Sequence, residues 1–231
     1  MELRQEMIPA KVDKVYNSLI IDAALPDNRI VPVFCGASEI VRLCTHGTIV
    51  WLRQTPSKLR KIKFELMFVS RAEGLIFVNP SYNRALFQEA FKAGILKDFT
   101  AYRYCRSIDP DDHLFHVDFE LSDESGAKCY VFIKNIYLKQ NGNAVFPSSM
   151  NFFEFEMFEE LGRLRKAGHR TAVFMLVPRN DCTEARFSWK FDPVASAKLF
   201  DEAKNGLDFV CYGCNLDKKS VSIAHQVKIV Y

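Results

Sequence analysis

The residues with the clearest chemical potential are an acid and an amine on two neighbouring strand-like runs. Asp118 lies in the run Phe115–Leu121, and Lys134 ends the run Cys129–Lys134. If Ser122–Ala127 forms the turn of a hairpin, the alternation of strand side chains brings the carboxylate and the amine to one shared face. With a second carboxylate, such a pair would hold a hard cation and activate a water molecule.

The first third of the chain must supply a separate unit, because it reads as a succession of short β-like runs. The predicted strands are Val12–Ala23, Arg29–Phe34, Thr48–Arg53, Lys61–Val69 and Leu75–Val78. Five short strands within about eighty residues predict a small barrel, and the oligonucleotide-binding-like β-barrel is one of the few types that close at this size. We therefore expect a barrel domain over residues 1–79.

From residue 80 onward, helical and strand-like patterns alternate. The predicted helices are Tyr82–Lys92, Asn151–Lys166 and Pro193–Lys204, and the predicted strands are Leu114–Leu121, Cys129–Leu138, Arg170–Val177 and Leu207–Cys214. This alternation predicts an α/β domain over residues 80–231, with functional groups at strand ends. Asp118 and Lys134 both fall within it.

Composition limits the setting rather than the chemistry. The 231 residues carry a net charge of only +3, so a polyanion site depends on local clustering of Lys and Arg. The seven cysteines are odd in number and scattered, which favours a reducing, cytoplasmic location over a disulfide scaffold. No apolar stretch reaches the length of a membrane span, so we expect no membrane partner.

Several ordered motifs resemble those of the sugar fermentation stimulation protein A (SfsA) family. They are Leu25-Pro26-Asp27 with Val31–Cys35, Val78-Asn79 with Asn83–Leu86, Val117-Asp118-Phe119, Tyr130–Lys134, Phe146-Pro147, Gly168-His169-Arg170 and Phe191-Asp192-Pro193. No single match is diagnostic, but their order and spacing are, over about Val15 to Ile223. The resemblance implies a restriction-endonuclease-like domain of the PD-(D/E)xK class after the barrel, and a DNA-binding role.

The resemblance also assigns residues to the nuclease site, and one of the expected carboxylates is absent from this sequence. The first carboxylate and metal ligand matches Asp118 and the lysine matches Lys134, but the second carboxylate falls on Phe132. A site with one carboxylate binds Mg²⁺ poorly, so we expect a degenerate active site whose nuclease activity is lost or weak. The alternative for Asp118 and Lys134 is a partly buried ion pair without turnover.

A relocated carboxylate would rescue catalysis. In some enzymes of this class the second carboxylate comes from the neighbouring helix, where Glu154 and Glu156 stand in this sequence. Under this alternative hypothesis, the protein is an active nuclease that depends on Mg²⁺ or Mn²⁺. The alternative for Glu154 is a capping box with Asn151 at the helix N-terminus, and for Glu156 a solvated surface position.

The densest basic cluster in the predicted barrel contains Arg53, Lys58, Arg60, Lys61 and Lys63. Cations along a groove, with aromatic rings nearby for stacking, bind a polyanion such as nucleic acid without any cofactor. Lysines also protect a solvated strand edge from aggregation, and the sequence leaves this second role open.

The predicted helix at Asn151–Lys166 begins with an unusually aromatic stretch, Phe152–Phe158. Its rings surround more than half of the helix, whereas a single buried stripe needs fewer. Some of them would then face a protein partner or a second copy of the chain. A non-enzymatic protein-interaction module is therefore a further hypothesis beside nucleic-acid binding and nuclease activity.

Overall fold

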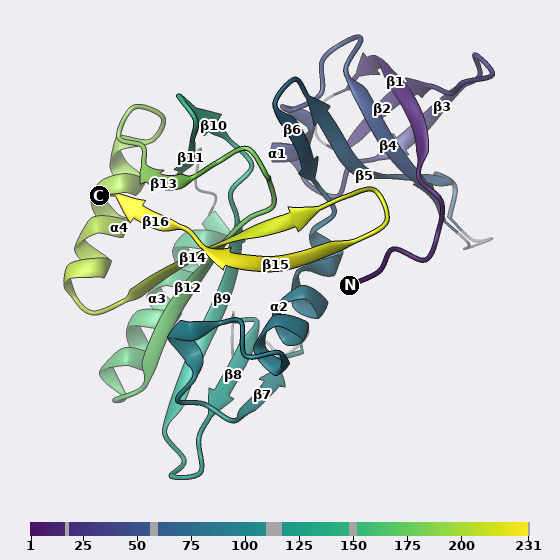
Figure 1. Ribbon diagram of the computed structural model, residues 1–231. Coiled ribbons are helices and arrows are strands. Elements are labelled where there is room, and N and C mark those ends of the chain that lie inside the picture. Colours follow the sequence, from purple (N-terminus) through teal and green to yellow (C-terminus); the bar gives the residue numbers. More distant parts are fainter. Residues whose placement is uncertain (17–18, 56–59, 110–116, 148–151, 231) are drawn as a thin grey trace. The chain divides into compact units, whose positions relative to one another are not determined.

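The computed structural model describes residues 1–16, 19–55, 60–109, 117–147 and 152–230, with the side chains of 152–155 excepted. It divides into two compact units (Figure 1). The first contains Met1–Leu86, Pro178–Asp181 and Cys214–Ser222, and the second contains Phe87–Val177, Cys182–Gly213 and Ile223–Tyr231. The expected boundary after residue 79 falls within the first unit, which also takes in two segments from late in the chain.

The first unit is built on a barrel. Its strands are β1 (Ile8–Val15), β2 (Ile20–Ala24), β3 (Ile30–Phe34), β4 (Ile49–Gln54), β5 (Phe64–Arg71) and β6 (Gly74–Phe77). β1 pairs with β2 and β4, β2 pairs with β3, and β5 pairs with β4. A short parallel pairing of β3 with β5 closes the ring in the order β1-β2-β3-β5-β4. Helix α1 (Ser38–Val41) lies between β3 and β4 in the chain.

One predicted strand of the barrel, Val12–Ala23, is wrong as a single element. The chain reverses between Val15 and Ile20, so the run forms the antiparallel pair β1 and β2. Apolar residues such as Tyr16 and Leu19 hide the reversal in the sequence, because neither glycine nor proline marks it.

A strap from late in the chain, Pro178–Asp181, runs beside β6 within the first unit. The N–H of Phe77 donates to the carbonyl of Pro178 at 2.9 Å, and the N–H of Leu75 donates to Oδ1 of Asn180 at 3.1 Å. Arg179 and Asp181 in the strap are both buried and form a bidentate ion pair with two 2.8 Å contacts. The strap therefore satisfies the outer edge of β6.

The second unit is built on a six-stranded mixed sheet with the order β15-β14-β12-β9-β8-β7, except that the end of β14 and the start of β15 fall within Cys214–Ser222 of the first unit. The strands are β7 (Tyr104–Ser107), β8 (Phe119–Ser122), β9 (Lys128–Asn135), β12 (Arg170–Val177), β14 (Asp208–Leu216) and β15 (Val221–Gln226). β12 pairs in parallel with β9 and β14, whereas β7, β8 and β9 are antiparallel. A smaller sheet contains β10 (Lys139–Gln140), β11 (Asn143–Phe146), β13 (Glu184–Phe187) and β16 (Lys228–Val230).

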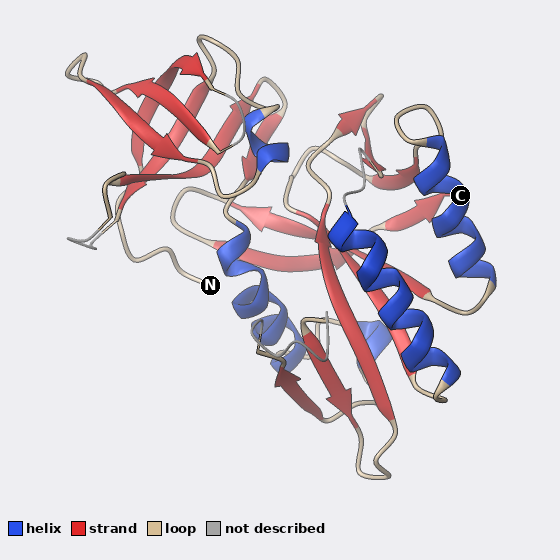
Figure 2. Ribbon diagram, turned by 180° about the vertical axis from the view of Figure 1, so that it is seen from behind, coloured by secondary structure: helices blue, strands red, loops and turns tan. Residues whose placement is uncertain are grey.

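Helices cover both faces of the main sheet. After the turn η1 (Pro80–Tyr82), α2 (Asn83–Lys92) places Phe87 against Phe119 and Phe174, at ring-centroid distances of 4.7 and 5.0 Å. On the opposite face, α3 (Phe152–Lys166) runs along β9 and β12 (Figure 2). Coverage on both faces explains why β12 is almost continuously apolar.

Helix α4 (Pro193–Lys204) has the predicted bounds, because Asp192 caps it, Pro193 opens it and Gly206 follows its end. The sequence does not predict β7, β11, β13, β15 and β16, since each is short or lacks clear alternation. No helix in the described part of the chain is long and apolar enough to cross a bilayer.

Candidate functional site

Asp118 and Lys134 come from the β8–β9 hairpin that the sequence predicts. Phe119 pairs with Val131, and this register places Asp118 opposite Phe132 on the face shared with Lys134. The N–H of Asp118 donates to the carbonyl of Val131 at 2.9 Å, and Oδ2 of Asp118 accepts the N–H of Ile133 at 2.7 Å. The Asp118 carboxylate is therefore tied to the backbone of the strand that carries Lys134.

Phe132, at the position where the family resemblance implies a second carboxylate, is part of the hydrophobic packing of the second unit. Its half-buried ring packs against the core cluster that includes Met157 and Phe158 of α3. Its Cα partner on β12 is Val173, which is fully buried in the same cluster. This position therefore offers carbon contacts and no oxygen ligand.

The neighbouring carboxylate on this face of β8, Glu120, is already engaged. Its Oε2 lies 3.1 Å from Nζ of Lys128, 3.2 Å from a guanidinium nitrogen of Arg106, and 3.1 Å from the donating hydroxyl of Tyr130. Partial burial opposes ionisation of Glu120, but these three donors outweigh it and lower the pKa of the carboxyl group. Glu120 therefore acts as the centre of an ion-pair cluster.

The relocated carboxylates do not complete a metal site among the described side chains. Glu156 is half-buried on α3, and the side chain of Glu154 lies outside the described residues. The described residues contain no group of three or more His, Cys, Asp or Glu side chains arranged to hold a metal ion. Because Mg²⁺ and Mn²⁺ require several oxygen ligands, the described residues around Asp118 do not fit such a cation.

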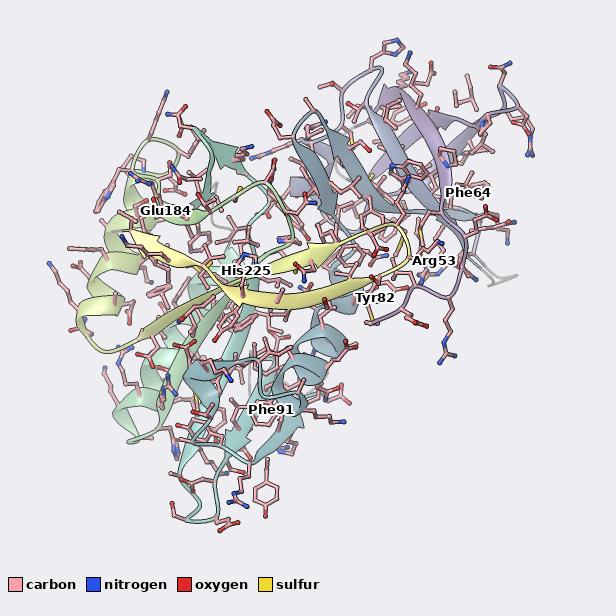
Figure 3. All side chains as sticks on the ribbon, in the orientation of Figure 1. Arg53, Phe64, Tyr82, Phe91, Glu184 and His225 are labelled. Atoms are coloured by element: carbon pink, nitrogen blue, oxygen red, sulfur yellow. The ribbon has the colours of Figure 1, made fainter. Side chains whose placement is uncertain are left out.

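Two of the five predicted nucleic-acid-binding cations, Arg53 and Arg60, converge on one buried acid in the barrel. Both donate to the carboxylate of Glu65, which is only 8% exposed on β5. Arg53 also donates to the hydroxyl of Tyr82, and its guanidinium lies 5.3 Å from the centre of that ring (Figure 3). The structure thus brings Arg53 and Arg60 together through Glu65 and Tyr82, two residues that the sequence did not single out.

The other predicted cations of this cluster differ in exposure. Lys61 is exposed and Lys63 is half-buried, whereas Lys58 lies outside the described residues. The side chain of Arg60 is 57% exposed even though it pairs with Glu65, and that of Arg53 is 23% exposed. Arg60 and Lys61 are therefore the cations of this cluster that solvent reaches most readily within the described residues.

The aromatic start of α3 is described only in part. Met157 and Phe158 are buried and belong to the core of the second unit. The side chains of Phe152, Phe153 and Phe155 lie outside the described residues, so the predicted partner surface stays a prediction.

Known proteins are similar to this chain along almost its whole length. The chain is 26% identical to the sugar fermentation stimulation protein homolog of Roseobacter denitrificans over 99% of both proteins. It is 29% identical to the homolog of Sinorhizobium medicae over 94% of this chain and 91% of that protein. Its structure is similar to that of Pyrococcus furiosus SfsA in complex with Ca²⁺, with a TM-score of 0.87, 14% identity, and coverage of 100% and 98%.

The structural similarity confirms the expected fold class, a small N-terminal barrel followed by a restriction-endonuclease-like α/β domain. The family model described as "Sugar fermentation stimulation protein RE domain" matches residues 81–220, which is more than half of the chain. The order of motifs, the barrel and the mixed sheet all agree with that match. The chain therefore belongs to the sugar fermentation stimulation protein family.

Proposed function

We propose that this protein binds nucleic acid, and DNA in particular, and that its nuclease-type site has lost or greatly weakened catalytic activity. The observation that carries the proposal is Phe132, whose ring packs into the core opposite Asp118, where the family resemblance calls for a carboxylate. Binding to a polyanion needs surface cations but no metal site. A family member can therefore keep the first function while losing the second.

The contacts around Asp118 support the proposal that nuclease activity is weak or absent. One carboxylate oxygen of Asp118 already accepts the N–H of Ile133 at 2.7 Å. Glu120, two residues further along, is held by Lys128, Arg106 and Tyr130. Glu120 would have to give up these donors in order to join Asp118 around a cation, at a cost in free energy. The solved relative from Pyrococcus furiosus is in complex with Ca²⁺; we expect this chain to bind divalent cations more weakly than a member with two free carboxylates.

The barrel supports the binding function. Arg60 and Lys61 are exposed next to the β3–β5 closure, and Arg53, Arg60 and Glu65 together keep one net positive charge there. Such a cluster attracts phosphates even when the whole protein is nearly neutral.

Binding is tested by fluorescence anisotropy with single- and double-stranded DNA and RNA of matched sequence. We expect binding to at least one of them that weakens when salt rises from about 50 to about 200 mM, because phosphate contacts release counterions. The charge-reversal double variant Arg60→Glu/Lys61→Glu should bind several-fold more weakly. Binding to none of the four probes at either salt concentration would refute the proposal.

Residual catalysis is tested separately with Mg²⁺ and Mn²⁺ on the same labelled substrates. We expect no cleavage above that of the Asp118→Ala variant. Divalent-dependent cleavage that disappears in Asp118→Ala would instead establish a working nuclease, and Glu154→Gln and Glu156→Gln would then identify the relocated carboxylate.

A further inference from the structure

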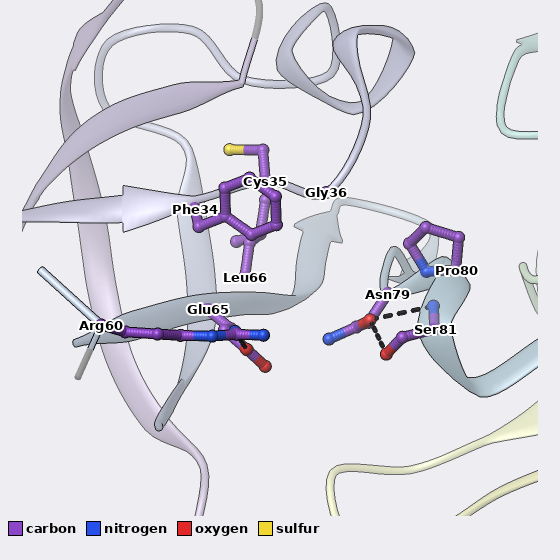
Figure 4. Close-up of a pocket in the computed structure, with 9 residues that line it drawn as sticks. All are labelled: Phe34, Cys35, Gly36, Arg60, Glu65, Leu66, Asn79, Pro80 and Ser81. Carbon is purple, nitrogen blue, oxygen red and sulfur yellow. Dashed lines mark hydrogen bonds and ion pairs between the residues drawn. The ribbon is translucent and has the colours of Figure 1, made fainter. Parts of the chain in front are cut away.

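The barrel contains a small pocket at the C-terminal end of β3, within the first unit (Figure 4). Phe34 and Gly36 line one side, Arg60 and Glu65 another, and Asn79 and Ser81 a third. Its volume is about 170 Å³. Because sites for complete small molecules are larger, about 300 Å³ or more, this pocket fits one chemical group, such as a single base or a phosphate.

Glu65 fixes the orientation of the Arg60 guanidinium at the mouth of the pocket. The carboxylate is 8% exposed and accepts from both Arg53 and Arg60, so the three side chains carry one net positive charge. Arg53 is held inward by Tyr82, whereas the Arg60 side chain stays 57% exposed. A guanidinium has five N–H donors, and Glu65 is the partner of Arg60 within the described residues. Arg60 is therefore oriented but retains donors for an anionic ligand.

Asn79 supplies a second hydrogen-bond donor to the pocket. Its Oδ1 accepts from the N–H of Ser81 at 3.2 Å and from the Ser81 hydroxyl at 2.6 Å, which fixes the orientation of the amide. Its Nδ2 donates to Sδ of Met67 at 3.3 Å. Met67 is fully buried, but a side-chain amide nitrogen carries two N–H donors, so Asn79 retains one for a carbonyl or ring nitrogen of a ligand.

Phe34 supplies an aromatic surface in the same pocket. It ends β3, is half-buried, and makes no ring–ring or cation–π contact with a described residue. Gly36 allows Pro80 to lie close to the end of β3, since a Cβ at position 36 would be only 3.2 Å from Cδ of Pro80. The φ angle of Gly36, +76°, is also one that glycine adopts more readily than other residues. An aromatic ring, a fixed guanidinium and an amide donor are the groups that proteins use on unstacked bases.

From these contacts we infer that the pocket receives the base of one unpaired nucleotide of a single-stranded nucleic acid, while the phosphate of that nucleotide stays at the mouth of the pocket. The base packs on Phe34, its edge accepts from Asn79, and the adjoining phosphate pairs with Arg60. A duplex hides its base faces within the stack, so it would reach Arg60 but not Phe34. This assignment rests on the proposed nucleic-acid binding and names its ligand and its site.

The test compares a single-stranded oligonucleotide with the duplex of the same sequence by fluorescence anisotropy. Phe34→Leu keeps an apolar side chain and should weaken single-strand binding about 5- to 100-fold while changing duplex binding less than about twofold. Arg60→Gln, an exposed position where misfolding is not expected, should weaken binding and lower the salt slope by about 0.7.

The matched control is Arg29→Gln. Arg29 is also an exposed arginine paired with an acid, Asp27, but it precedes β3 at the end opposite to Phe34. It should bind like the wild type. The pocket assignment is overturned if Phe34→Leu and Arg60→Gln bind the single strand like Arg29→Gln, or if Phe34→Leu weakens duplex binding equally. If the wild-type protein binds no nucleic acid at all, the proposed function itself fails.

Discussion

At the scale of single residues, one substitution separates this chain from the chemistry that its family resemblance implies. Phe132 lies opposite Asp118, pairs with Val173 and packs against the core that includes residues of α3, so it makes a hydrophobic contact where the family resemblance implies a metal ligand. A hydrophobic side chain here stabilises the second unit, whereas a carboxylate would lie close to Asp118 and require a cation to offset the repulsion.

We therefore predict that Phe132→Glu lowers the stability of the protein and strengthens its binding of divalent metal ions. We expect it to lower the free energy of unfolding by about 3 kcal/mol through lost packing, and to bind Mn²⁺ at least about tenfold more tightly than the wild type. Chemical denaturation and calorimetric titration measure the two effects. Phe132→Leu is the control, since it loses aromatic packing without adding oxygen. If Phe132→Glu binds Mn²⁺ no better than Phe132→Leu, Asp118 and position 132 do not form a latent metal site.

At the scale of elements, the strap Pro178–Asp181 shows how a segment remote in sequence completes the barrel unit. Asn180 accepts the N–H of Leu75, and this requires the amide to lie where a side chain at Gly74 would be. A Cβ at Gly74 would lie only 2.2 Å from Oδ1 of Asn180. Gly74 therefore leaves room for the Asn180 side chain to reach the N–H of Leu75.

Two glycine substitutions should therefore have opposite effects on stability. Gly74→Ala displaces Asn180 from Leu75, and we expect a loss of about 1–2 kcal/mol in the free energy of unfolding. Gly162→Ala, inside α3, adds a Cβ that has no described heavy atom of another element within 4 Å, and it should gain about 0.5–1 kcal/mol from better helix propensity. Urea denaturation measures both. Equal effects from the two variants would contradict the role given to the strap.

At the scale of the whole molecule, the cysteines report on folding of both units. Six of the seven thiols are buried, and Cys105 is half-buried. Burial raises the pKa of Cys35, Cys129 and Cys214 to about 12, and that of Cys44 and Cys105 to about 11, from an ordinary value of 9.0. The folded protein therefore retains thiol protons that the unfolded chain releases.

Stability should accordingly depend on pH in the alkaline range. The stabilisation is fully present below pH 9 and is lost as the pH rises toward 12, because the unfolded state binds fewer protons in that interval. We expect the urea midpoint to fall above pH 9.

At pH 8, a thiol reagent should modify Cys105 first and the other six cysteines only on unfolding, and Cys105→Ser should remove the early phase of modification. Rapid modification of all seven thiols in the native protein would contradict the described burial.

Local signals explain which elements the sequence predicts well. Asp192 and Pro193 start α4 and Gly206 follows it, so its bounds need no tertiary information. Within the run Arg170–Val177, the six residues Ala172–Val177 are all apolar, Gly168 precedes the run and Pro178 follows it, and the run forms β12 with the same bounds. The reversal between Val15 and Ile20 escapes prediction because its turn-favouring pair, Asn17-Ser18, is short and lies within an otherwise strand-like run.

The sequence by itself determined the family and the two-part architecture, because these depend on residue types in order along the chain, and it places Phe132 where the family resemblance implies a carboxylate. Only the tertiary structure decided what the charged residues contact. Glu65 is five residues from Arg60 and 12 from Arg53, and the antiparallel pairing of β4 with β5 places it directly opposite Arg53, so that it becomes the partner of both. Contacts between strands depend on pairing register and burial, which local patterns do not encode, and these contacts turn a basic cluster into a pocket with one fixed cation.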